Sequence, residues 1–173
     1  MEENVSVTTR SAGIRYGLIL GVASIAFFVV MNVAGVDMQG PLSYLGWLIT
    51  IAVIYFAHKY FKENGDGYMT IGQGIGVGFW TGLVSTFISA PFTYIYIKFI
   101  DSAFLENIKD KQIEKMQEQG MSDEQIDQGM KMAEMFMSAE AILVMGIIGG
   151  LIMALIFAVI VSLFTKNTPP ETI

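Results

Sequence analysis

Four methionines near residue 130 are the side chains of this sequence best suited to hold a metal ion. Thioether sulfur is the soft ligand type that Cu(I) selects, and the segment from 130 to 137 contains Met130, Met132, Met135 and Met137. No His or Cys accompanies them, since the chain has no cysteine and only one histidine, His58. Methionine also fills apolar helix faces. We expect that second use, and therefore no metal and no cofactor.

A stripe of carboxylates precedes the methionines. At four-residue spacing the chain has Glu106, Asp110, Glu114 and Glu118. Such a stripe could attract a cation or a basic partner, but a charge run of this kind usually forms a solvated helix face. The alternating Asp or Asn ligands before a glycine that an EF-hand loop requires are absent.

Patterns that would indicate catalysis are also missing. The sequence has no P-loop, no HExxH, no GxSxG and no pairing of His with an acid or of Cys with His. We therefore expect no enzymatic activity and no catalytic residues.

Polar residues within apolar segments could mark a transport pathway, because such groups are costly in lipid. Transport predicts a continuous polar cavity lined by Asn32, Gln73, Ser85 and Ser89, whereas interhelical hydrogen bonding would bury these side chains in helix contacts. The ionisable side chains closest to the segments, among them His58, lie at segment ends. We interpret His58 as an interfacial side chain rather than a ligand or a proton relay.

The apolar segments themselves are the dominant feature of the 173 residues. All 26 charged residues are excluded from four stretches of 21, 20, 29 and 25 residues, namely 16–36, 38–57, 69–97 and 141–165. A membrane-spanning helix needs about 20 apolar residues. The 15% of charged residues is also well below the ~25% of soluble domains. A disordered chain, a disulfide scaffold and a water-soluble enzyme are excluded, and a polytopic membrane protein remains.

Caps and turns divide the chain into four helices in two hairpins, within one membrane domain covering residues 1–173. We expect helices at about 11–34, 41–61, 70–100 and 139–165, a polar connection at 101–138 and a short tail at 166–173. Pro91 is expected to kink the third helix, with Ser85, Thr86 or Ser89 satisfying the freed carbonyls. A secretory signal is the alternative for the first segment, but that segment is too long for a signal core and long enough to span.

Residues 101–140, which contain the polar connection, hold the whole net charge of −6, with ten acids against four lysines. The apolar positions of the connection recur at helical spacing, so we expect an amphipathic helix broken at Gly120. Ser122 and Gln125 form a capping box, from which a second piece should run directly into the last helix. Nucleic-acid binding is excluded, because it requires a basic surface.

Orientation follows from the charges around the first helix. Arg10 and Arg15 precede it, and no Lys or Arg follows until Lys59, which favours a cytoplasmic N-terminus. Four spans then place both termini in the cytoplasm and residues 101–138 outside it.

Small residues recur at every fourth position in three of the four helices. In lipid, such faces allow backbones to approach closely and supply packing attraction. They predict either packing within the bundle, which we favour, or a dimer interface. The candidates are Gly13, Gly17, Gly21, Gly74, Gly78, Gly82, Gly146, Gly150 and Ala154.

Two glycine-rich motifs resemble those of a known family. Tyr16-Gly17-Leu18-Ile19-Leu20-Gly21 opens the first span, and Asn64-Gly65-Asp66-Gly67-Tyr68-Met69-Thr70-Ile71-Gly72-Gln73-Gly74 opens the third. They resemble the bacterial membrane family catalogued as domain of unknown function 4199. The resemblance implies a four-helix inner-membrane protein with a longer polar connection before the last helix. It implies no activity and no site residues.

The sequence as a whole predicts a non-enzymatic integral membrane protein that acts through helix packing or partner contact. A small transporter or channel component is the alternative. The expected partners are the lipid bilayer and either a second copy of the chain or another membrane protein.

Overall fold

The computed structural model of the protein describes residues 7–36 and 40–169. The connection between the first two expected helices lies partly outside these ranges, and so do the last residues of the expected tail, 170–173. Within the described ranges the chain forms six α-helices, a 3₁₀ turn at Pro41–Ser43 and a π turn at Tyr96–Ile100. The α-helices are α1 (Thr9–Val33), α2 (Tyr44–Glu63), α3 (Ile71–Ile95), α4 (Phe104–Glu118), α5 (Asp123–Glu134) and α6 (Ala139–Thr165).

Four helical segments are long and apolar enough to cross a bilayer. They are Thr9–Val33, Pro41–Glu63, Ile71–Ile100 and Ala139–Thr165, with mean hydropathies of 2.1, 1.4, 1.4 and 2.9. Large apolar side chains such as Val22, Phe56 and Ile152 are more than half exposed on these helices, as expected for surfaces that face lipid. The predicted all-α, polytopic membrane fold with four spans is confirmed.

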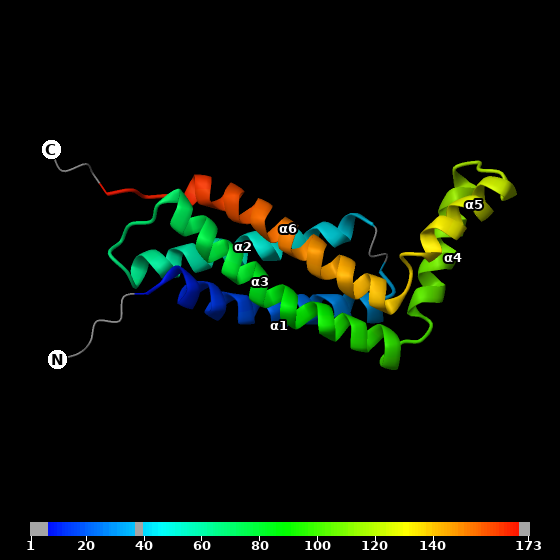
Figure 1. Ribbon diagram of the computed structural model, residues 1–173, viewed down its shortest axis with the longest axis horizontal. Coiled ribbons are helices and arrows are strands. Elements are labelled where there is room, and N and C mark those ends of the chain that lie inside the picture. Colours follow the sequence, from blue (N-terminus) through cyan, green and yellow to red (C-terminus); the bar gives the residue numbers. More distant parts are fainter. Residues whose placement is uncertain (1–6, 37–39, 170–173) are drawn as a thin grey trace. The chain divides into compact units, whose positions relative to one another are not determined.

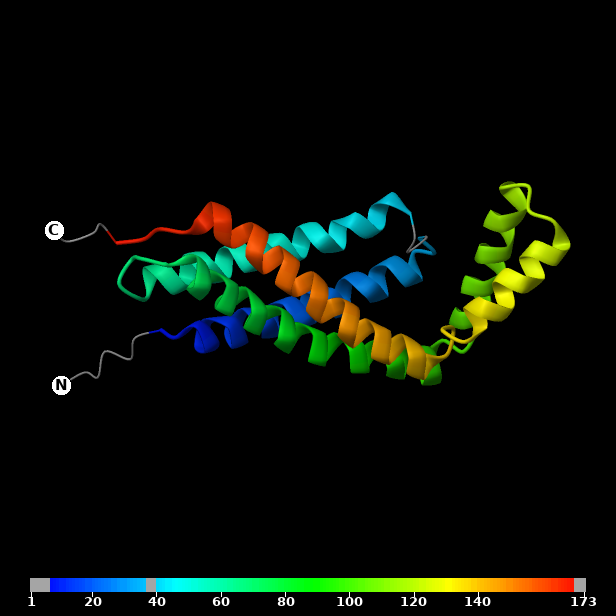
Figure 2. The same cartoon turned by 45° about the horizontal axis from the view of Figure 1, so that its top comes forward.

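Interresidue contacts divide the chain into two compact units, the first formed by residues up to 89 together with those from 148 onward. In this unit α1, α2, α3 and α6 lie side by side (Figures 1 and 2). The start of α1, the α2–α3 turn and the end of α6 lie at the same end of the bundle (Figure 1). There Met69 N–H donates to Asn167 O at 2.7 Å and Asn167 N–H donates to Met69 O at 2.9 Å. This pairing ties the α2–α3 turn to the end of α6.

The second unit comprises residues 90–147 and contains the antiparallel hairpin of α4 and α5. Gly120 has φ +73° at the turn, a conformation that glycine adopts without strain. Ser122 then begins α5: its hydroxyl accepts from Gln125 N–H, and the Gln125 side chain accepts from Ser122 N–H. A Cβ added at Gly129 would lie 2.6 Å from the Met116 methyl carbon, so the two helices approach closely here.

The expected continuous helix from Asp123 into the last span is wrong. The helix α5 ends at Glu134, and α6 begins only at Ala139. Ser138 supplies the physical reason, because its hydroxyl accepts from Ala141 N–H at 3.0 Å and so caps a new helix.

The third span also differs from the expected single α-helix. The α-helix ends at Ile95, and the backbone widens into a π turn that closes when Asp101 N–H donates to Tyr96 O at 2.9 Å. Pro91 lies inside α3 and cannot donate a helix hydrogen bond. Among the described residues, none of the hydroxyls of Ser85, Thr86 and Ser89 bonds to a carbonyl, contrary to expectation. A kink at Pro91 stays a prediction.

Candidate functional site

The helices α3 and α6 meet along two facing rows of small residues. A Cβ added at Gly74 would lie 2.6 Å from Ser162 Oγ, and one at Gly78 would lie 2.5 Å from Ala158 Cβ. At Gly82 an added Cβ would collide with Ala154 Cβ. Going four residues forward along α3 corresponds to going four residues backward along α6. The α3 glycines are therefore in contact with a neighbouring helix of the same chain.

Glycines of α1 lie against larger side chains of α3. A Cβ added at Gly13 would collide with Trp80. One added at Gly17 would lie 2.6 Å from Val84 Cβ, and one added at Gly21 would lie 3.0 Å from Ile88 Cβ. On the basis of these contacts, α1 packs against a different face of α3 from the one that meets α6. This places α3 between α1 and α6.

The two remaining glycine candidates differ from each other. At Gly150 an added Cβ would lie 2.8 Å from Thr86 Oγ1, so this glycine adjoins α3. Gly146 is exposed, and the nearest atom to an added Cβ is Ala90 Cβ at 4.0 Å. The close helix approach along α6 therefore involves Gly150 but not Gly146.

His58 joins three helices of the bundle and has no exposed surface. Its Nε2 lies 2.9 Å from Gly74 O on α3, and its Nδ1 lies 2.8 Å from Thr165 Oγ1 on α6. A carbonyl only accepts, so we assign the ring proton to Nε2, which leaves Nδ1 to accept from the Thr165 hydroxyl. Its ring is buried between helices, which the sequence did not predict, because α3 and α6 supply partners for both nitrogens.

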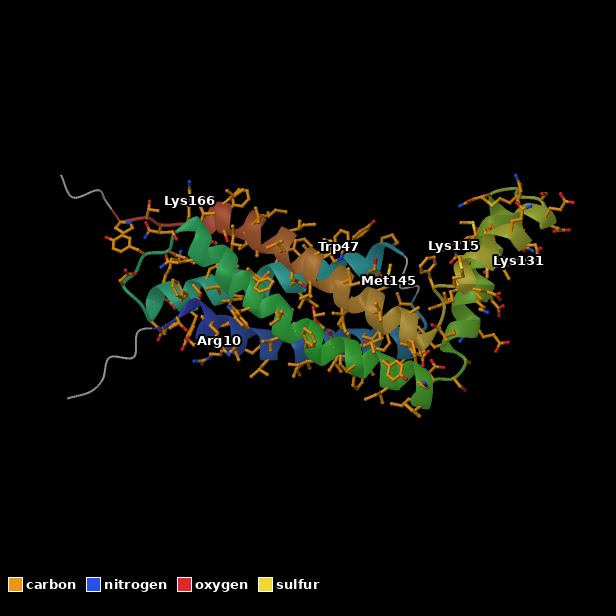
Figure 3. All side chains as sticks on the ribbon, viewed as in Figure 1. Arg10, Trp47, Lys115, Lys131, Met145 and Lys166 are labelled. Atoms are coloured by element: carbon orange, nitrogen blue, oxygen red, sulfur yellow. The ribbon has the colours of Figure 1, made fainter. Side chains whose placement is uncertain are left out.

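Cations and aromatic rings surround the same end of the bundle. The Arg10 guanidinium lies 5.1 Å from the Trp80 ring, and that of Arg15 lies 4.5 Å from the Tyr60 ring while donating to its hydroxyl at 2.9 Å. Figure 3 shows Arg10 and Lys166 at this end. Aromatic and basic side chains are typical of membrane–water interfaces.

A cavity of about 170 Å³ lies within the first unit and is lined by all four helices. Its polar side chains are the hydroxyls of Ser24, Thr50, Ser85, Thr86 and Ser89 and the indole of Trp47, and none of its lining residues is ionisable. Apolar side chains, including Leu20, Met153 and Phe157, complete the wall.

The cavity includes only part of the pathway that transport predicts. Ser85 and Ser89 line it, whereas Gln73 and Asn32 do not. The Gln73 side chain instead caps the start of α3, where its Oε1 accepts from Thr70 N–H at 2.8 Å. Sequence reasoning did not propose Ser24, Thr50 or Thr86 as cavity residues, because their convergence depends on how α1, α2 and α3 pack.

The second unit contains a groove of about 520 Å³ between α4 and α5. Leu105, Ile113, Met130 and Met137 form its apolar part. Its polar part comprises Ser102, Glu106, Lys109, Asp110 and Glu134. We call this feature the hairpin groove.

Two lysines of the hairpin already have acidic partners. Lys109 Nζ lies 3.1 Å from Glu134 Oε1, and Lys131 Nζ lies 2.7 Å from Asp127 Oδ2. The hydrogen bond to Asp127 raises the pKa of Lys131. The four carboxylates of the α4 stripe are all exposed, and two of them, Glu106 and Asp110, line the hairpin groove.

The four methionines considered for copper do not share one face. Met130 and Met137 line the hairpin groove, whereas Met132 and Met135 are each 68% exposed. Among the residues that the structure describes, no group of three or more His, Cys, Asp or Glu side chains could hold a metal ion.

Comparison with known proteins adds a family but no relative with an assigned role. The family model described as "Protein of unknown function (DUF4199)" matches residues 15–167. The search of curated proteins found no match, and the search of solved structures found none either.

Proposed function

Because the chain belongs to the family described as "Protein of unknown function (DUF4199)", which carries no assigned activity, we propose its role from the molecule itself. The protein is a non-enzymatic, multi-pass membrane protein whose α4–α5 hairpin binds a basic amphipathic helix of a partner protein. The observation that carries this proposal is the hairpin groove, whose lining combines apolar side chains with Glu106 and Asp110, two acids that have no ion-pair partner among the described residues.

The lining of the groove supports recognition of a helix. Met130 and Met137 are flexible and polarisable, so they can adapt to apolar side chains of different shapes. An amphipathic helix binds by placing one apolar face in such a groove. Leu105 and Ile113 extend the apolar lining along α4.

The charge supports a basic partner. Residues 101–140 have six more acids than lysines, and Lys109, the lysine in the groove, is paired with Glu134. Glu106 and Asp110 remain available to Lys or Arg side chains of a partner. A second copy of the hairpin would bring the same negative charge, so a different, basic protein fits better.

A synthetic helix of Leu and Lys, with the lysines on one face, tests this role on the full chain in nanodiscs of zwitterionic lipid. We expect saturable binding that weakens with added salt. The double variant Glu106→Gln/Asp110→Asn should lower the affinity roughly tenfold, because two charge-assisted contacts are lost. Isothermal titration calorimetry measures the affinity, and protein-free nanodiscs measure binding of the peptide to lipid.

The matched control is Glu114→Gln/Glu118→Gln, which removes the same charge from the same helix outside the groove. It should retain most of the affinity. Equal weakening by both double variants would mean diffuse attraction to an acidic surface and would contradict recognition by the groove.

The proposed orientation has both termini in the cytoplasm and the hairpin outside it. It is supported by the positive-inside rule applied to the first span, because Arg10 and Arg15 precede it and no Lys or Arg follows it until Lys59. Reporter fusions after residues 64 and 120 should give an internal signal at 64 and an external signal at 120. The reverse pattern would overturn the orientation.

A small transporter component is the second candidate function. The cavity lined by Ser85 and Ser89 favours it, since these are two of the four side chains that a transport pathway requires. The positions of Gln73 and Asn32 outside the cavity lining make it the weaker candidate.

A further inference from the structure

Some hydroxyl groups of the bundle bond to their own helix, and others do not. Thr50, Thr81 and Ser162 each donate to the carbonyl four residues earlier in their own helix. By contrast, the hydroxyls of Ser24, Ser85, Thr86 and Ser89 have no hydrogen-bond partner among the residues that the structure describes. All four of these side chains line the 170 Å³ cavity.

The burial of two of these side chains makes their lack of a partner significant. Ser85 is 6% exposed and Thr86 is 7% exposed. The described structure contains no fully buried side-chain oxygen without a partner, so the small accessible surface of these hydroxyls belongs to space that a molecule can enter. An occupant of that space can form the hydrogen bonds that these hydroxyls do not make with the protein.

We propose that this cavity binds a small neutral molecule, about one ring in size, that carries a hydroxyl or carbonyl oxygen. No lining residue is ionisable, which favours a neutral ligand over an ion. Leu20, Met153 and Phe157 provide apolar contact for the ring, while Ser85 and Thr86 bond to its oxygen. The site is independent of the partner that the hairpin binds.

Size and depth restrict the ligand further. The 170 Å³ of the cavity is close to the ~150 Å³ of an engineered apolar cavity that holds benzene in another protein. Ser24, Ser85 and Ala154 lie near the middle of α1, α3 and α6, respectively. A ligand therefore has to dissolve in the hydrocarbon layer, which excludes sugars, amino acids and other strongly hydrated molecules.

The probe for this site is 4-fluorobenzyl alcohol, observed by fluorine NMR with the full chain in zwitterionic nanodiscs. We expect saturable binding that protein-free nanodiscs do not show. The ring without the hydroxyl, 4-fluorotoluene, should bind several-fold more weakly. The double variant Ser85→Ala/Thr86→Val should weaken alcohol binding, by roughly three- to tenfold for each hydrogen bond lost. The matched control Thr81→Val removes a buried hydroxyl of α3 outside the cavity and should leave the affinity unchanged.

Three results would overturn the proposal. The first is partitioning of the alcohol that never saturates and equals that of protein-free nanodiscs. The second is equal affinity for the alcohol and for 4-fluorotoluene, which indicates an apolar site without hydroxyl recognition. The third is unchanged affinity in the double variant. If the double variant fails to fold, the single variants Ser85→Ala and Thr86→Val decide the outcome, because at least one of them must weaken binding.

Discussion

Replacing Gly78 with Leu should lower the free energy of unfolding by about 3 kcal/mol, the upper end of the usual cost of overpacking. The Cβ alone would lie 2.5 Å from Ala158 Cβ and 2.9 Å from Ala158 Cα, so the backbones of α3 and α6 would have to separate. Separation also removes contacts along both small faces, which are the main attraction between helices in lipid. SDS titration of the protein in mixed micelles, followed by circular dichroism, measures the effect.

Two glycines of α6 provide a matched comparison for this prediction. Gly150→Leu should also destabilise, since Thr86 Oγ1 would lie 2.8 Å from the new Cβ. Gly149→Leu introduces the same side chain one residue earlier, where an added Cβ has no neighbouring atom within 4 Å. It should leave stability nearly unchanged. If Gly78→Leu and Gly150→Leu were as stable as Gly149→Leu, close contact at Gly78 and Gly150 would not contribute to helix packing.

Replacing His58 with Leu should cost about 3 kcal/mol as well. The substitution removes the N–H that donates to Gly74 O and the bond between Nδ1 and Thr165 Oγ1, at a position that has no exposed surface. Each buried polar group that loses its hydrogen bond costs about 1–3 kcal/mol. The same SDS titration measures the loss, and Lys59→Leu, at an exposed position of the same helix, is the control.

The amide variants separate the two bonds of His58. The amide nitrogen of Gln can replace Nε2 and still donate to Gly74 O, whereas Asn is shorter and can reach only the position of Nδ1. His58→Gln should therefore retain more stability than His58→Asn if the bond to α3 is the stronger of the two. A His58→Leu variant as stable as the unsubstituted protein would contradict a structural role for the ring.

Local signals predicted much of the fold. Charge exclusion over four segments identified the spans, and the capping box at Ser122 located the start of α5 within one residue. A similar box, in which Thr8 and Ser11 cap each other, starts α1 at Thr9, two residues before the expected boundary. Each of these features depends on residues within one or two helical turns. They can therefore be read without knowing what packs against them.

The candidate sites were less predictable. Ser85 and Ser89 were recognised as polar residues of a span, but Thr86 was considered only as a partner for carbonyls near Pro91. The burial of His58 was not predicted, because neither Gly74 nor Thr165 is near it in sequence. The hairpin groove depends on α5 folding back along α4, which places Met130 beside Leu105.

The sequence by itself determined that this chain spans a membrane four times and concentrates its negative charge in one connection. Hydropathy and charge act on each segment separately, so they require no knowledge of its neighbours. Only the tertiary structure decided which small faces meet, that His58 joins three helices, and that five hydroxyls converge on one cavity. These features depend on the register between helices, and register is set by contacts between residues such as Gly82 and Ala154 that lie far apart in the chain. Lipid provides no hydrophobic force to choose among the arrangements, so close fit between backbones selects one.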